Sequence, residues 1–221
     1  DEMVDEEKLD PMQALEVGRQ LLAGLACAHA QGVLHRDLKT ENVFVVRHPG
    51  GRMQAKLLDF GLVKFVDDER WGEARKLTVA GSVMGSPAYM SPEQGTGGTM
   101  DARSDVYSAG VVLYELITGS WPFSRDSRIE MLKAHLLEPV PTLAAGRPGL
   151  SARPELDVLL RKALAKEADQ RFGDATEMLA ALDAVPQPAA WLEHAGTRQP
   201  RMRGGALPAL ECVRRHAARG P

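Results

Sequence analysis

Four polar residues in two short stretches of the chain could carry chemistry together. Asp37, Lys39 and Asn42 lie in the stretch at residues 35–42, and Asp59 follows 17 residues after Asn42. Carboxylate and amide oxygens are the ligands that a hard cation such as Mg²⁺ prefers. An aspartate taken singly is more often a turn residue or a solvated carboxylate, so the surrounding sequence decides what these four residues do.

A helix and a hairpin are predicted around these stretches. Residues 15–29 carry apolar side chains at helical spacings of three and four, a stripe that ends at His29. Asp10-Pro11 just upstream is a start signal, an N-cap followed by proline at the first helical position. Residues 42–46 and 55–58 are short β-rich runs, and the turn-forming stretch HPGGR between them predicts a hairpin. The stretch at residues 35–42 therefore connects helix and hairpin, and the second stretch directly follows the hairpin.

The rest of the chain is predicted to be mainly helical. Residues 104–117 form a broad apolar surface, as in a helix buried on most sides, and further helices are predicted at 128–137, 154–165 and 175–184. Residues 66–85 are polar without a period, which predicts a long exposed loop. The order of helix, hairpin, loop and helices predicts an α+β fold dominated by helices.

The two polar stretches have the order and spacing of kinase motifs. HRDLKTEN at residues 35–42 and Asp-Phe-Gly at residues 59–61 resemble the catalytic loop and the metal-binding turn of protein kinases. Asp-Phe-Gly alone is a common tripeptide, and the eight matched positions ahead of it give the resemblance its specificity. The resemblance implies a mainly helical, kinase-like C-terminal lobe whose small β-hairpin carries both loops.

This resemblance implies ATP and Mg²⁺ as cofactors and a role for each of the four polar residues. Asp37 would orient or accept the proton of a substrate hydroxyl, and Lys39 would neutralise charge on the transferred γ-phosphoryl group. Asn42 and Asp59 would supply oxygen ligands to Mg²⁺. His35 is expected to be structural, packed near the Asp-Phe-Gly turn.

A second block, GSPAYMSPE at residues 85–93, resembles the end of a kinase activation segment. Its last residue, Glu93, matches a glutamate that forms a buried ion pair in the family, and Arg171 matches the partner arginine. Asp105 resembles the family's buried aspartate that holds the backbone of the catalytic loop. Its plainer interpretation is a helix N-cap or a charge at the helix N-terminus. We assign all three residues a structural role.

Local features of the resemblance favour serine and threonine as acceptors over tyrosine. They are Lys39, two residues after Asp37, and the stretch GSPAY. Ser86 is expected to hydrogen-bond near Asp37 and Lys39, where the family usually has threonine. Thr40 stands at a frequent proline position, and we expect this replacement to have little effect. The stretch MSPEQ at residues 90–94 is similar to bacterial members of the family.

Arg36 precedes the predicted catalytic aspartate. Kinases with an arginine at this position often need a phosphate on the activation loop, which a guanidinium can bind through two hydrogen bonds. Thr78 and Ser82 are the candidate phosphate acceptors in the predicted loop. Each would more often be an ordinary polar loop residue.

The resemblance covers roughly residues 10–185. A complete kinase also has a β-rich N-lobe with a Gly-rich loop and a Lys–Glu pair, and the 34 residues before His35 leave no room for it. We expect residues 1–185 to be a partial kinase domain without this lobe. Phe44 and Leu58 would remain from the floor under the adenine ring.

Two functional classes stay open. One is an active serine/threonine kinase of which this chain is a fragment, with protein substrates and the N-lobe as partners. The other is a noncatalytic, pseudokinase-like scaffold or an inactive truncated product. The intact motifs favour descent from an active enzyme, whereas the missing lobe favours the second class for the chain in isolation. A small-molecule kinase of related fold is disfavoured by the resemblance at residues 85–93.

Composition excludes several other classes. Of 221 residues, 44% are hydrophobic and 26% charged, as in globular proteins, and a net charge of −3 does not favour nucleic acid or an anionic membrane as a partner. No apolar run approaches the roughly 20 residues of a membrane span. Cys27 and Cys212 lie outside any CxxC spacing, which fits a reducing cytoplasm. Residues 186–221, rich in Pro, Ala, Gly and Arg, are expected to be a poorly ordered tail.

Overall fold

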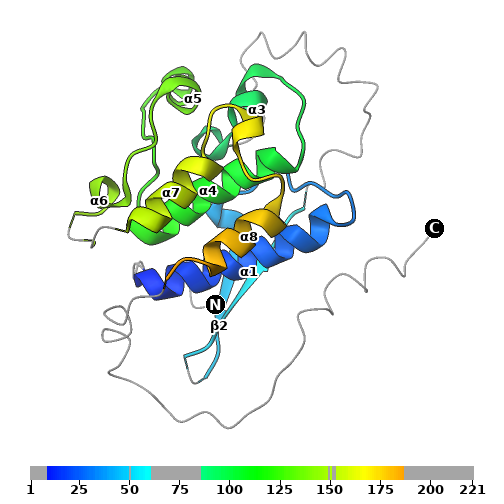
Figure 1. Ribbon diagram of the computed structural model, residues 1–221, viewed down its shortest axis with the longest axis vertical. Helices are drawn as coiled ribbons and strands as arrows, with labels where there is room; N and C mark the ends of the chain where they lie inside the picture. Colours follow the sequence, from blue (N-terminus) through cyan, green and yellow to red (C-terminus); the bar gives the residue numbers. More distant parts are fainter. Residues whose placement is uncertain (1–8, 50, 61–85, 149, 151–152, 187–221) are drawn as a thin grey trace.

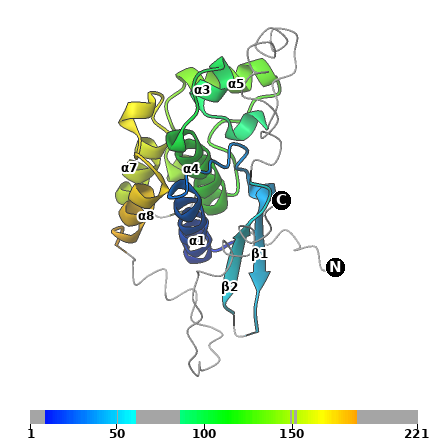
Figure 2. The ribbon, with the colours of Figure 1, turned by 90° about the vertical axis from the view of Figure 1, so that its right-hand side faces the viewer.

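Two long helices, α1 (Pro11–His29) and α4 (Ala102–Thr118), pack against each other in the centre of the computed structural model (Figure 1, Figure 2). The structure describes residues 9–49, 51–60, 86–148, 150 and 153–186. Helix α4 is buried along most of its length, as its broad apolar surface predicts. At Gly110, an added Cβ would lie only 3.0 Å from the side chain of Ala163, so glycine permits a close helix contact there.

Helix α1 begins at Pro11, as the start signal Asp10-Pro11 predicts, four residues before its apolar stripe. Asp10 is the N-cap, and its carboxylate accepts a hydrogen bond from the N–H of Gln13 at 2.9 Å. The side chain of Gln13 in turn accepts from the N–H of Asp10 at 3.2 Å, and Pro11 occupies the first helical position. This capping box supplies polar partners to the first turn, which apolar periodicity cannot detect.

Strands β1 (Val43–Arg47) and β2 (Met53–Leu57) form an antiparallel hairpin against α1. Val43 pairs with Leu57, and both pack against the core. The side chain of Gln20 on α1 accepts from the N–H of Ala55 at 2.7 Å and donates to the carbonyl of Met53 at 3.1 Å. These two bonds fasten β2 to the helix.

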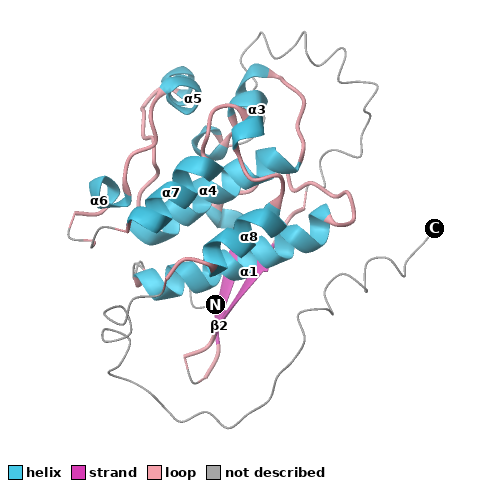
Figure 3. Ribbon diagram, in the orientation of Figure 1, coloured by secondary structure: helices cyan, strands magenta, loops and turns pink. Residues whose placement is uncertain are grey.

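The remaining elements of the described residues are all helical (Figure 3). Figure 2 shows the hairpin on one side of α1 and helix α8 on the other. The longer elements are α5 (Arg128–Leu137), α7 (Pro154–Ala163) and α8 (Ala175–Asp183). The short elements are η1 (Thr40–Asn42), η3 (Pro87–Tyr89), α3 (Pro92–Thr96), α6 (Leu143–Gly146) and η4 (Ala168–Gln170).

The predicted helix at 128–137 is confirmed at both ends, and those at 154–165 and 175–184 end within two residues of prediction. The hairpin strands are shifted by one or two residues. The short helices α3 and α6 were not predicted, because one turn is too short for a periodic pattern. The predicted α+β fold dominated by helices is confirmed. The predicted loop at 66–85 and all of the predicted tail except Pro186 lie outside the described residues.

Candidate active site

A buried carboxylate holds the backbone of the loop that contains the predicted catalytic residues. Asp105, only 2% exposed, accepts hydrogen bonds from the N–H groups of His35 at 2.7 Å and Arg36 at 2.8 Å. The N-cap of α4 is Asp101, whose carboxylate accepts from the N–H of Arg103, so the N-cap interpretation of Asp105 is wrong. Asp105 instead occupies the first turn and joins α4 to the loop.

A third donor to Asp105 is His29, the last residue of α1. Its Nε2 lies 3.0 Å from Oδ2 of Asp105, and its Nδ1 accepts a hydrogen bond from the N–H of Ala175 at 3.3 Å. Because Nδ1 accepts, Nε2 carries the hydrogen and donates it to the carboxylate. The sequence predicts His29 only as the end of the apolar stripe, and no local pattern indicates its partner 76 residues away.

Arg36 has an unusual backbone conformation. Its φ angle is 67°, in the left-handed region that residues with a Cβ rarely adopt. Asp105 holds its N–H, and the side-chain Nε2 of Gln94 donates to its carbonyl oxygen at 2.8 Å. Both main-chain polar groups of Arg36 are therefore bound by side chains from elements distant in sequence.

The side chains of Asp37 and Lys39 point into accessible space. Asp37 Oδ2 and Lys39 Nζ lie 3.6 Å apart, and the two side chains are 47% and 27% exposed. A carboxylate that must accept a proton from a bound hydroxyl has to be reachable by the substrate. The structure thus brings together, at the surface, the two residues that the sequence predicts to be catalytic.

His35 joins the loop to the Asp-Phe-Gly turn. Its Nε2 lies 3.1 Å from the carbonyl oxygen of Leu58, and its ring centroid lies 4.8 Å from that of Phe60. Burial lowers the pKa of His35, against the opposing charge of Asp105, so the neutral ring donates from Nε2 to the carbonyl. His35 lies near the turn as expected and contacts no reacting group among the described residues.

Asn42 and Asp59 lie at neighbouring ends of the hairpin. The N–H of Leu58 donates to the carbonyl of Asn42 at 2.9 Å, which places Asp59, the next residue, beside it. The Nδ2 of Asn42 donates to the carbonyl of Asp37 at 2.8 Å, so the amide oxygen is the atom left to act as a ligand. Asp59 is exposed.

The donor set fits a Mg²⁺ ion that is held partly by phosphates. Among the described residues there is no group of three or more His, Cys, Asp or Glu side chains that could hold a metal ion. Mg²⁺ is commonly bound through one or two carboxylates together with water and substrate phosphates. Asn42 and Asp59 supply a number and type of oxygen ligand that match this arrangement.

One face of the hairpin exposes large apolar side chains. Phe44 pairs with Lys56 across the strands, and paired residues lie on the same face. Because side chains alternate along a strand, Leu58, two residues after Lys56, lies on that face too, opposite to Val43 and Leu57. Phe44 is 56% exposed and Leu58 41%. The other face of the hairpin packs against α1.

The end of the predicted activation segment is anchored by an ion pair. Arg171 NH1 and NH2 donate to the two carboxylate oxygens of Glu93 at 2.7 Å and 2.8 Å, and the Ser104 hydroxyl donates to the same carboxylate at 2.7 Å. The Arg171 side chain is fully buried. Burial alone would raise the pKa of Glu93, but the hydrogen bonds from Arg171 and Ser104 outweigh it and hold this pKa below its usual value.

Tyr89 and Thr40 join this segment to the catalytic loop, a contact that was expected of Ser86. Between Ser86 and the Asp37 and Lys39 side chains, all of which the structure describes, there is no hydrogen bond; the carbonyl of Ser86 instead accepts from the N–H of Tyr89 as η3 begins. The hydroxyl groups of Thr40 and Tyr89 lie 2.7 Å apart. The expectation that Thr40 has little effect therefore missed a direct contact.

The phenol hydroxyl of Tyr89 has three hydrogen-bond partners. It donates to the Glu115 carboxylate at 2.7 Å and accepts from Trp121 Nε1 at 3.0 Å and from Thr40. Burial raises its pKa, which keeps the phenol protonated. The predicted acceptor residues Thr78 and Ser82 lie outside the described residues.

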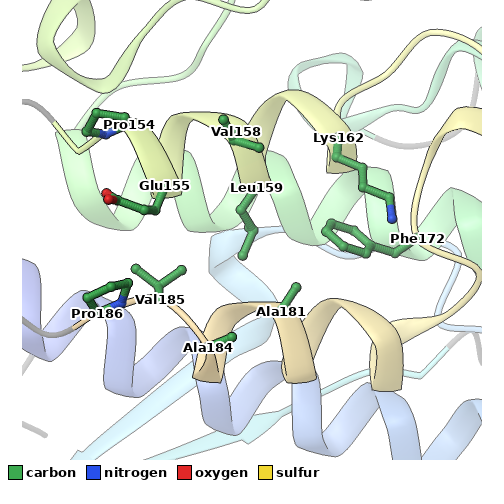
Figure 4. Close-up of a pocket in the computed structure, with 10 residues that line it drawn as sticks. All are labelled: Pro154, Glu155, Val158, Leu159, Lys162, Phe172, Ala181, Ala184, Val185 and Pro186. Carbon is green, nitrogen blue, oxygen red and sulfur yellow. The ribbon is translucent and has the colours of Figure 1, made fainter.

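An apolar hollow of about 520 Å³ lies between α7 and α8, away from these residues (Figure 4). Leu159, Phe172 and Val185 line it, with Lys162 and Glu155 as the charged side chains. None of the residues that the sequence predicts to be functional lines this hollow. With one carboxylate and one ammonium group among apolar side chains, this lining offers fewer polar groups than a site for phosphates and Mg²⁺ needs.

Comparison with known proteins decides the family. The family described as "Protein kinase domain" matches residues 1–182. The chain belongs to the protein kinase family.

The curated relatives of this kinase chain include bacterial serine/threonine-protein kinases. Pkn3 of Myxococcus xanthus is 41% identical over 177 residues, which cover 80% of this chain and 32% of that protein. PknL of Mycobacterium tuberculosis is 38% identical over 185 residues, covering 84% of this chain and 43% of that protein. The chain thus spans less than half the length of the curated relatives it matches.

The solved structure of the M. tuberculosis PknI kinase domain has the same fold. It aligns with a TM-score of 0.57 and 27% sequence identity over 82% of this chain and 57% of that one. Among the described residues of the present kinase chain, no helix has both the length and the apolar character needed to cross a membrane.

Proposed function

We propose that this chain is the larger, C-terminal lobe of a serine/threonine protein kinase, which transfers the γ-phosphate of ATP to serine and threonine hydroxyls of proteins. The observation that best supports it is the pair of accessible side chains Asp37 and Lys39, which lie near the oxygen ligands of Asn42 and Asp59. The backbone of their loop is held by the buried carboxylate of Asp105. Residues 1–185 form the kinase domain in this proposal, residues 186–221 are a separate tail, and the protein acts in the cytoplasm.

Phosphoryl transfer needs positioning and charge compensation more than covalent help. Asp37 binds the substrate hydroxyl and takes its proton, and Lys39, 3.6 Å away, faces the charge on the transferred group. Asn42 and Asp59 would hold Mg²⁺, which would neutralise charge on the ATP phosphates. The hydrogen bond from Asn42 to the carbonyl of Asp37 couples the metal side of the site to the catalytic side.

The exposed hairpin face supports adenine binding. Phe44 and Leu58 offer an apolar surface next to Asn42 and Asp59, where a flat ring could lie while its phosphates reach the two oxygen ligands. In a complete kinase the N-lobe covers the opposite side of the nucleotide. We infer that this face meets the N-lobe of the active enzyme.

The end of the activation segment supports a protein substrate. The Glu93–Arg171 pair fixes its C-terminal end, and Tyr89 places η3 beside the catalytic loop. Arg36 is proposed to bind a phosphate carried by Thr78 or Ser82, which would order the segment. Ser86 lies at the start of η3, on the same segment.

Transfer of labelled phosphate from ATP with Mg²⁺ tests the proposal, with the full-length natural protein and its Asp37→Asn variant measured side by side. We expect label in the wild type and a loss of at least a hundredfold in kcat for Asp37→Asn, since a positioned base contributes about 10²–10⁴-fold. The variant should keep the melting temperature of the wild type. Retained turnover in Asp37→Asn would falsify its catalytic role, and no label in either protein would favour a noncatalytic scaffold.

A further inference from the structure

Gln94 contacts both the start of helix α3 and the catalytic loop. Its side-chain Oε1 accepts from the N–H of Ser91 at 3.0 Å, and its own N–H donates to the Ser91 hydroxyl at 3.4 Å, which closes a capping box. Its Nε2 donates to the carbonyl oxygen of Arg36 at 2.8 Å. One amide therefore uses its oxygen for the helix and its nitrogen for the loop.

The carbonyl that Gln94 binds belongs to a residue in a strained conformation. Arg36 has a φ of 67°, which its surroundings must stabilise. Asp105 binds the N–H of Arg36, and Gln94 binds the carbonyl at the other end of the residue. This carbonyl is part of the peptide that joins Arg36 to Asp37, so its direction sets the plane from which the Asp37 side chain extends.

We propose that Gln94 is a positioning residue for phosphoryl transfer, whose amide nitrogen fixes the Arg36–Asp37 peptide and so orients the Asp37 carboxylate toward the substrate hydroxyl. This inference rests on the proposed function, because Asp37 needs an orientation only if the protein transfers phosphate. The Thr40–Tyr89 contact joins the same segment to the loop at a second point. The N–H of the Arg36–Asp37 peptide donates to the carbonyl of His35 at 2.9 Å, and Gln94 binds its carbonyl oxygen from a different segment.

Gln94→Glu separates the two tasks of the side chain. Glutamate serves as well as glutamine in a capping box, but its ionised side chain has no N–H. The variant therefore keeps an acceptor for Ser91 and places an oxygen where the carbonyl of Arg36 requires a donor. We expect kcat to fall about tenfold, the size of effect that one lost hydrogen bond can produce in a transition state. The KM for ATP should stay near the wild-type value, and the melting temperature should fall by no more than it does in the control variant below, because one part-buried hydrogen bond is lost.

Ser91→Ala is the matched control, because it removes the hydroxyl of the capping box and leaves the amide of Gln94 in place. This variant should have a lower melting temperature than the wild type and the same kcat. Kinetics of peptide phosphorylation and thermal unfolding of the full-length natural protein provide both readouts, with Asp37→Asn alongside. A wild-type kcat in Gln94→Glu overturns the inference. It is also overturned if kcat falls in both variants in proportion to the fall in melting temperature, since the loss of activity would then reflect stability alone. An inactive wild type overturns the proposed function, and the inference falls with it.

Discussion

The side of the molecule that carries the catalytic loop and the side formed by α7 and α8 differ in what they bury. On the catalytic side, charged groups are buried and paired: Asp105 and Arg171 are 2% and 4% exposed, and both bind main-chain atoms as well as side chains. Between α7 and α8 the structure has an apolar hollow lined by residues such as Leu159 and Phe172 (Figure 4). This hollow is therefore not where the polar chemistry is built.

A further difference lies within the catalytic side itself. The side chains proposed to act on substrate, Asp37 and Lys39, are 47% and 27% exposed, whereas Asp105, which holds their loop, is buried. Burying a charge is costly unless it is fully hydrogen-bonded, and Asp105 meets this condition with three donors. Because buried Asp105 fixes the backbone of the loop, Asp37 and Lys39 can be held in position and still stay accessible to a substrate.

The largest effect should follow from breaking the Glu93–Arg171 pair. Glu93→Gln leaves the fully buried Arg171 side chain without its counter-charge, and we expect the free energy of unfolding to fall by about 3–5 kcal/mol. Urea unfolding measures the change. The double variant Glu93→Gln with Arg171→Met should recover part of the loss, because it removes the unpaired charge. A single variant within about 1 kcal/mol of the wild type would contradict the importance of this anchor.

Stability on the catalytic side should also depend on pH through His135. This residue of α5 is 1% exposed, its Nδ1 lies 2.9 Å from the Tyr107 hydroxyl, and burial lowers its pKa from 6.5 to about 4. Between these values the unfolded chain binds a proton that the folded protein excludes, so stability falls as the pH falls. The contribution is intact above pH 6.5 and amounts to about 3 kcal/mol when lost at pH 4.

The variant His135→Phe isolates this contribution, because the carboxylates and the other histidines titrate equally in the variant and in the wild type. Urea unfolding at pH 7 and at pH 4.5 gives the pH-dependent part for each protein. We expect the drop in unfolding free energy between the two pH values to be smaller in His135→Phe than in the wild type. Equal drops in the two proteins would show that His135 titrates normally.

The part of the fold that could be predicted from sequence is the part with local signals. The helix at residues 128–137 has several turns of periodic apolar residues, and the predicted range is confirmed. Asp37, Asn42 and Asp59 were identified because a short motif carries them together with their hairpin. Their proposed roles in catalysis and metal binding remain predictions that activity measurements must test.

The family resemblance predicts the contact of Asp105 with the catalytic loop and the Glu93–Arg171 pair, and both contacts are present in the structure. The other positioning contacts could not be predicted, because they join residues far apart in sequence. Gln94 binds the carbonyl of Arg36 58 positions away, and His29 binds Asp105 across 76 positions. The hydroxyl of Thr40 contacts that of Tyr89, whereas Ser86, the serine expected at this contact, is the N-cap of η3. Each contact depends on how α1, α4 and the segment before α3 pack, which no local pattern contains.

A smaller effect is expected from Asp105→Asn, which removes the buried charge that holds the catalytic loop and keeps the size of the side chain. The amide keeps one acceptor oxygen and turns an NH₂ group toward a main-chain donor of the loop, so we expect a loss of about 1.5–3 kcal/mol in unfolding free energy and a lower kcat. Asp101→Asn, at the N-cap of the same helix, is the control, because aspartate and asparagine cap equally well. Similar losses in both variants would argue against a special role for Asp105.

The smallest effect should come from the other side, at Val158 on α7. This residue lines the hollow but is 64% exposed, so Val158→Ser removes little buried apolar surface. We expect a change within about 0.5 kcal/mol in unfolding free energy and an unaltered kcat, measured by urea unfolding and peptide phosphorylation. A variant that unfolded as expected but lost phosphoryl transfer would give the hollow a part in catalysis. The division between an apolar side and a polar, catalytic side would then have to be abandoned.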